Sequence, residues 1–114
     1  MQKLALIVVD SDPRRSHRPA EAVRLAAGLS GWMPERLAIC LMGSAAGLLG
    51  DGADLLGEED LQVSWPVLRD AGTAVYTDFP PAPGTRPQFL GAVREIDAAG
   101  VARLAAGVDC LLRF

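Results

Sequence analysis

The sequence of 114 residues lacks several features that would mark particular classes of protein. It contains no asparagine, which excludes the Asn-X-Ser/Thr acceptor of N-glycosylation. Its two cysteines, Cys40 and Cys110, form neither a CxxC motif nor the spacing of a zinc site. No apolar run reaches the roughly 18 residues of a membrane span, and the run after Met1 lacks a signal-peptide cleavage site. We therefore expect a reduced, cytoplasmic protein with no metal and no membrane partner.

Charge and apolar content narrow the classes further. Eleven basic residues face 14 acidic ones, giving a net charge of −3, which leaves little attraction for the phosphates of a nucleic acid. Half of the residues are apolar, whereas intrinsic disorder requires low hydrophobicity and high net charge. The length is that of one domain, so we expect residues 1–114 to fold as a single unit without a nucleic-acid partner.

Continuous apolar runs alternate with segments of helical periodicity. The runs at 3–9 and 36–42 have the composition of strands buried on both faces, and shorter strands are expected at 73–77 and 108–114. The segment 89–96 fits either a helical turn or a short strand, which would cover 93–96. Helices are expected after Pro19, over 44–49 with Ser44 as the cap, over 58–71, and after Asp97 as the cap. This alternation predicts an α/β fold with a mostly parallel sheet and helices on both faces.

Candidate ligand-binding residues follow three of the predicted strands. In open α/β sheets, ligands bind outside the carboxyl ends of the strands, which selects segments 10–18, 43–45 and 76–78. The arginines of the first segment, beside a helix N-terminus, suit a small anion. A solvated loop whose charges pair among themselves is the alternative. The candidates are Asp10, Arg14, Arg15, His17, Arg18, Ser44 and Asp78.

Nucleophiles and cofactor motifs give weaker signals. Cys40 falls inside a predicted strand and Cys110 near the start of another, so we interpret each as a core side chain. They remain weak nucleophile candidates, and no other catalytic residue is predicted. The sequence has neither a GxGxxG nor a GxxxxGK[ST] motif, so no cofactor is expected. The Pro-rich segment 79–87 is predicted to be a loop, and a lid or an interface arm are the alternatives.

The order of elements resembles the DsrE/DsrF-like family, which includes DsrH and the TusB, TusC and TusD sulfur-relay subunits. The resemblance is carried by residues 4–9, 20–29, 37–49, 68–76 and 96–114. It implies a three-layer α/β/α sandwich with a five-stranded parallel sheet. It also implies assembly into homo-oligomers or with related DsrE-like subunits.

Active members of this family carry a persulfide on a cysteine just after the third strand. The corresponding stretch here, residues 75–79, reads Val-Tyr-Thr-Asp-Phe and contains no thiol. Since sulfur transfer needs a thiolate, the sequence is more similar to members without the carrier cysteine, and we expect a non-catalytic accessory or ligand-sensing subunit. The alternatives are a sulfur carrier that uses Cys110 or Cys40, and an anion binder that uses the loop 10–18.

Overall fold

In the computed structural model, which describes residues 5–31, 33–50, 54–79 and 93–114, five strands form a single sheet. Their order across the sheet is β4-β3-β2-β1-β5, and every pairing between neighbours is parallel. The strands are β1 (Ala5–Val9), β2 (Leu37–Leu41), β3 (Ala74–Thr77), β4 (Val93–Glu95) and β5 (Cys110–Arg113). The α/β prediction with a mostly parallel sheet is therefore confirmed.

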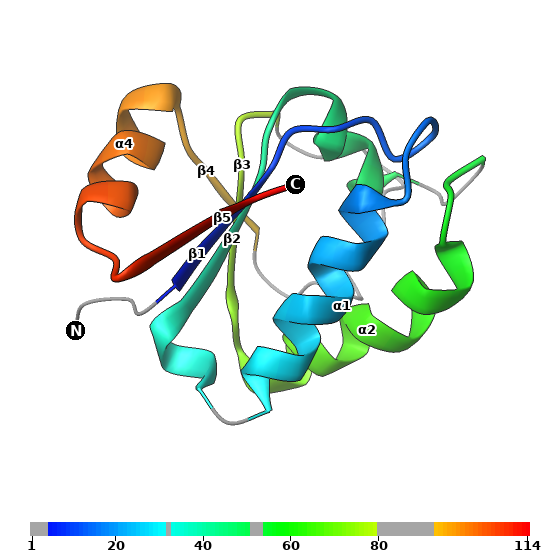
Figure 1. The fold of residues 1–114 in the computed structure, drawn as a ribbon, viewed down its shortest axis with the longest axis horizontal. Coiled ribbons are helices and arrows are strands. Elements are labelled where there is room, and N and C mark those ends of the chain that lie inside the picture. Colours follow the sequence, from blue (N-terminus) through cyan, green and yellow to red (C-terminus); the bar gives the residue numbers. More distant parts are fainter. Residues whose placement is uncertain (1–4, 32, 51–53, 80–92) are drawn as a thin grey trace.

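Helices cover both faces of this sheet (Figure 1). Two α-helices, α1 (Arg18–Ser30) and α2 (Glu58–Ala71), lie on one face, and α4 (Ala98–Ala106) lies on the other. Two 3₁₀ helices, η1 (Pro34–Arg36) and η2 (Gly43–Leu49), flank β2 in the chain. The three layers are those of the α/β/α sandwich that the family resemblance implies.

Strand β1, which lies between β2 and β5, explains why both faces must be covered. All five of its side chains are buried, and successive side chains point to opposite faces of a sheet. Ala5, Ile7 and Val9 pack in the core beneath α1 and α2, whereas Leu6 and Val8 pack in the smaller core beneath α4. Strand β2 repeats the alternation, with Ile39 in the first core and Cys40 in the second. A continuous apolar run is thus the sequence signature of a strand between two helical layers.

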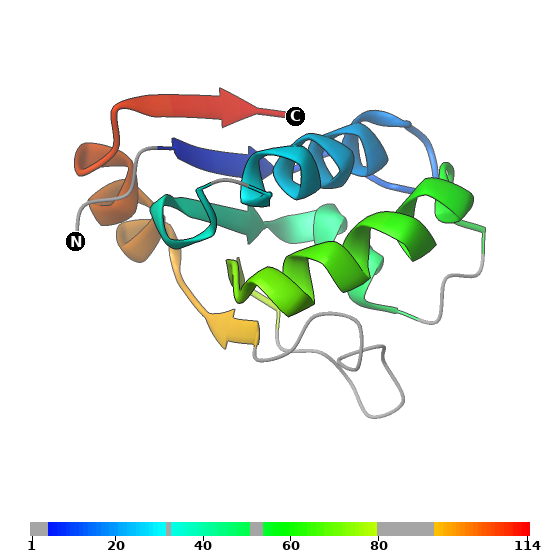
Figure 2. The same ribbon diagram turned by 90° about the horizontal axis from the view of Figure 1, so that it is seen from below.

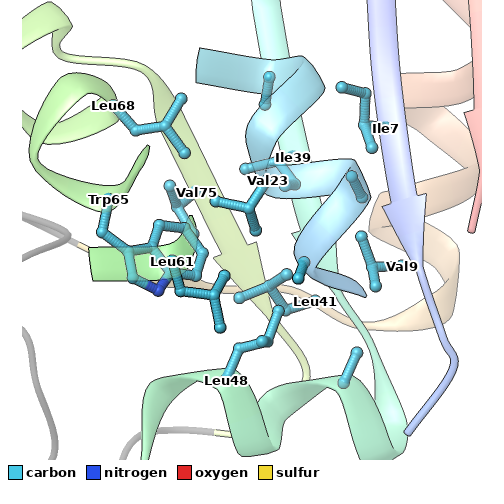
Figure 3. Packing of buried hydrophobic residues seen from close by; sticks show 14 of the residues in the cluster. Ile7, Val9, Val23, Ile39, Leu41, Leu48, Leu61, Trp65, Leu68 and Val75 are labelled. Carbon is cyan, nitrogen blue, oxygen red and sulfur yellow. The ribbon is translucent and has the colours of Figure 1, made fainter. Parts of the chain in front are cut away.

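The larger core lies between the sheet and the α1–α2 pair (Figure 3). Leu61, Trp65 and Leu68 follow one another at i, i+4 and i+7 on the inner face of α2, and all three are buried. They meet Val23 of α1 and residues of β2 and β3. Trp65 is among the largest fully buried side chains of this core.

The predicted caps have different outcomes. Asp97 caps α4, since its Oδ1 accepts a hydrogen bond of 2.7 Å from the Gly100 N–H. Ser44 does not cap the helix after β2: η2 begins one residue earlier, at Gly43, and Met42 holds the N-cap position without a side-chain bond. That prediction was wrong because the turn already begins at Gly43, whose φ is +56°.

Pro66 lies inside α2, which runs unbroken from Glu58 to Ala71. Within the segment 79–87 only Phe79 is described, and its side chain is 67% exposed; the rest of that segment lies outside the described residues. No helix within the described ranges has the length and apolar character that a membrane span requires.

Candidate functional site

The carboxyl ends of β2 and β3 are joined by one carboxylate. Asp78 directly follows β3, and its Oδ1 and Oδ2 accept hydrogen bonds of 3.0 and 3.2 Å from the N–H of Gly43, two residues after the end of β2. Gly43 adopts a φ of +56°, a conformation that side chains disfavour. The glycine therefore permits the turn that aims its N–H at Asp78.

A cavity of about 640 Å³ lies beside Asp78, where β3 and β4 end and α4 begins. Ile96 lines this cavity, and its position is fixed because the Ile96 N–H donates a hydrogen bond of 2.8 Å to the Thr77 carbonyl. Gly100 allows α4 to approach, since a Cβ there would stand 2.5 Å from Cγ1 of Ile96. The lining residues are Asp78, Glu95, Ile96, Asp97, Ala98, Gly100 and Arg103.

Charge of both signs lines this cavity. Among the described residues, its lining includes the carboxylates of Asp78, Glu95 and Asp97 and the guanidinium of Arg103. Asp78 and Asp97 are engaged by the N–H groups of Gly43 and Gly100, so the backbone fixes their positions. Small-molecule sites are usually apolar pockets with a few placed polar groups, whereas this cavity is open to solvent and its lining is mainly charged. The arrangement suits a polar ligand that donates hydrogen bonds to carboxylates.

Asp10 and Arg18 lie elsewhere on the same edge, where they hold the end of β5. The Asp10 carboxylate pairs with the Arg113 guanidinium at 2.6 Å. Arg18 donates from Nη2 to the Arg113 carbonyl at 3.0 Å, and its guanidinium lies 5.5 Å from the centre of the Phe114 ring. These two candidate residues therefore have a structural task at the β1–β5 boundary.

The remaining residues of the loop do not converge on one point. Arg15 lies 3.9 Å from the carboxylate of Asp12, whose other oxygen accepts from the backbone N–H of Arg14. His17 occupies the N-cap position of α1 without a side-chain cap, and it lines a second cavity of about 410 Å³ at the start of α2. The local pairing at Asp12 is what a solvated loop would show. Ser44 is exposed beside Gly43.

The structure thus separates the sequence-predicted residues into groups. Asp78 lies at the cavity, Asp10 and Arg18 hold β5, and His17 lies at the start of α2. Sequence reasoning missed Glu95 and Arg103 as lining residues and assigned Asp97 only to capping. The signal that could have found Glu95 is its place at the end of the fourth strand, where the carboxyl-edge rule also applies.

The two thiols have opposite environments. Cys40 is buried in β2, and burial raises the pKa of its thiol from 9.0 to about 11, so the thiolate is disfavoured. Cys110 is exposed, and the expectation that it belongs to the core was wrong. Cys110 is the first residue of β5. Because all strands are parallel, its thiol lies at the amino ends of the strands, whereas the cavity lies at their carboxyl ends. Among the described residues, no three His, Cys, Asp or Glu side chains are grouped to hold a metal.

Comparison with known proteins supports the class of fold. The five-stranded parallel sheet and the helices on its two faces form a three-layer α/β/α sandwich. The chain is similar to the crystal structure of the ychN protein from E. coli, with a TM-score of 0.72 and 21% identity over 100% of both chains. No family model and no curated protein matches the sequence. At 21% sequence identity, this similarity supports a shared fold alone.

Proposed function

We propose that this protein is a non-catalytic, ligand-binding subunit of DsrE-like fold, with an accessory or sensing task, whose ligand occupies the cavity beside Asp78. The cavity of about 640 Å³ at the carboxyl edge is the observation that carries this proposal. It lies where β3 ends, which is the place at which the family resemblance puts the sulfur-carrying cysteine, and here that place is held by Asp78.

The positions of the thiols support a role other than sulfur transfer. A persulfide carrier must be reachable and must form a thiolate, whereas Cys40 is buried and its pKa is raised to about 11. Cys110 is exposed but lies on β5, three strands away from β3 in the sheet order. At about 4.8 Å between neighbouring strands, the lateral separation alone is about 14 Å.

The charges of the cavity support a small polar ligand with a positive group. Asp78, Glu95 and Asp97 would accept from an ammonium or guanidinium group, and Arg103 would bind an oxygen of the same molecule. This ligand differs in sign from the small anion that the loop 10–18 predicts. An anion would instead find the exposed Arg14 and Arg15 side chains beside the start of α1.

A thermal-shift screen separates these ligand classes. Amines and amino acids form one arm, and phosphate, sulfate and nucleotides form the other. A ligand at 100 times its Kd stabilises the fold by about 2.7 kcal/mol. We expect stabilisation in the first arm that is lost in Glu95→Gln and kept in the control Glu59→Gln, which lies at the other cavity. Stabilisation by neither arm, or a shift that Glu95→Gln leaves intact, would contradict the proposal.

A sulfur carrier that acts through Cys110 is the second candidate, favoured by the exposure of that thiol. Intact-mass spectrometry after treatment with a persulfide donor tests it, with Cys110→Ala as the control. Sulfur that is bound at Cys110 and then passed to an acceptor thiol would favour the carrier. Sulfur that is not passed on would leave the ligand-binding proposal in place.

A further inference from the structure

One arginine lines the cavity beside Asp78 without a charged partner. Within the part of the chain that the structure describes, the Arg103 guanidinium forms no ion pair with the three carboxylates that line the same cavity. Two of those carboxylates, Asp78 and Asp97, are held by backbone N–H groups instead. Charges of both signs therefore line one cavity without neutralising each other.

The start of α4 sets these charges at two separate ends of the cavity. Figure 2 shows β4 leading directly into α4, so Glu95 and Asp97 lie where the strand ends and the helix begins. Arg103 follows Asp97 by six residues, which is a rise of about 9 Å along the helix axis. Since helical side chains lean toward the N-terminus of their helix, the Arg103 side chain extends back along α4 toward the carboxylates.

A small apolar surface separates the two charged ends. Gly100 and Arg103 are three residues apart, so they share one face of α4. The side chain of Ile96 packs against Gly100, where a Cβ would stand 2.5 Å from Cγ1 of Ile96 and 3.2 Å from Oδ1 of Asp97. Both Ile96 and Gly100 line the cavity. This surface suits the carbon skeleton of a ligand that carries a charge at each side.

We propose that the ligand is a free amino acid and that Arg103 selects it by binding its carboxylate, while the carboxylates at the strand ends bind its ammonium group. The inference rests on the proposed function, because it assigns a chemical class to the ligand of the same cavity. A planar guanidinium can donate two parallel N–H bonds to one carboxylate. The N-terminus of α4, which would otherwise attract an anion, is already capped by Asp97.

The two charged ends act against ligands that carry charge of one sign. An amine without a carboxylate would leave Arg103 unpaired and bring a like charge toward it. An anion without an ammonium group would meet the three carboxylates of the lining. Binding sites gain specificity from such repulsion as well as from attraction. An amino acid supplies each end with the opposite charge.

Matched pairs of probes test this assignment on the full chain. The probes are the common amino acids, each as the free acid and as its carboxamide, which keeps the ammonium group and the side chain but removes the negative charge. At about pH 6.5 the amino groups of both are protonated. Thermal shift identifies the pairs that bind, and isothermal titration gives the Kd of each member. We expect the amide to bind at least about tenfold more weakly than the acid, the scale of a charge-assisted hydrogen bond.

A pair of arginine variants locates the selection. In Arg103→Gln, we expect the free acid to bind as weakly as its amide, because the positive charge is lost. Arg94→Gln is the matched control, since Arg94 is an exposed arginine of β4 that is not among the described lining residues. That variant is expected to keep the tenfold preference for the acid. Circular dichroism verifies that both variants fold.

The outcomes separate this inference from the proposed function. An amide that binds as tightly as its acid, or a preference for the acid that survives in Arg103→Gln, overturns the selection by Arg103 and leaves a cavity that binds amines. Loss of the preference in Arg94→Gln as well as in Arg103→Gln overturns it too, because the effect would then follow net charge. Binding of neither member of any pair overturns the inference together with the proposed cavity ligand.

Discussion

At the scale of single residues, the two cysteines show what strand composition predicts and what it cannot. Both lie in apolar runs, and both were expected in the core. Cys40 is buried because β2 has neighbours on both sides and helices on both faces. Cys110 begins an edge strand, where its side chain is exposed. Which strand is outermost depends on the order of the strands in the sheet, and the composition of an apolar run does not reveal that order.

The thiols should therefore differ in reactivity. With iodoacetamide, we expect Cys110 to be modified and Cys40 to remain unmodified up to about pH 10, since its pKa of about 11 keeps the buried thiol neutral. Intact-mass spectrometry counts the added groups. The same treatment in guanidinium chloride should modify both residues. Rapid double modification of the native chain would contradict the burial of Cys40.

At the scale of elements, the sequence predicts helices better than sites. The range 58–71 was expected and α2 spans it, because Gly57 and Gly72, with φ of +78° and +72°, bound a regular apolar spacing. The last strand, expected over 108–114, spans only Cys110–Arg113, since an apolar run does not show where pairing starts. Arg103 was missed as a cavity residue because its place beside the ends of β3 and β4 follows only from how α4 packs on the sheet.

Pro66 inside α2 gives a prediction about stability. Proline provides no N–H for the helical bond to the carbonyl four residues earlier, and its ring crowds that carbonyl. Pro66→Ala restores the donor, so we expect stabilisation by about 1 kcal/mol after the gain in unfolded-chain entropy is subtracted. Urea denaturation measures the change, with the exposed Val67→Ala as a near-neutral control. Destabilisation by Pro66→Ala would show that the ring makes contacts worth more than the missing bond.

The cap of α4 gives a second prediction at this scale. Asp97→Ala removes the acceptor of the Gly100 N–H and should destabilise the fold by about 1 kcal/mol. Asp97→Asn keeps an acceptor oxygen and should lose much less. Urea denaturation of the three chains gives the comparison. Equal losses in both variants would mean that the carboxylate charge, rather than the hydrogen bond, stabilises α4.

At the scale of the whole molecule, strand order decides which loops meet. The sequence predicted one site from the ends of three strands, and the structure divides those residues. Gly43 and Asp78 meet because β2 and β3 are neighbours, whereas Asp10 follows β1 and finds its partner on β5. Strand order arises from the packing of all helices on the two faces. Local sequence patterns could therefore predict which residues lie at the carboxyl ends of the strands, but not which of those residues lie next to one another.

The β1–β5 junction joins parts of the chain more than one hundred residues apart, and two substitutions separate its packing from its charge. Phe114→Ala removes a partly buried ring from the core edge and from beneath Arg18. We expect a loss of about 2 kcal/mol, less than the 3–5 of a fully buried ring. Asp10→Asn breaks the exposed pair with Arg113 and should lose under about 1 kcal/mol, and less still in high salt.

Amide hydrogen exchange, read at the Asp10 and Phe114 N–H groups, locates the effect. Phe114→Ala should speed exchange at both amides, because the ring holds the last residue against β1. Asp10→Asn should leave them protected, since the backbone bonds remain. If Asp10→Asn opened the junction as far as Phe114→Ala does, the ion pair rather than apolar packing would hold β5 to the sheet.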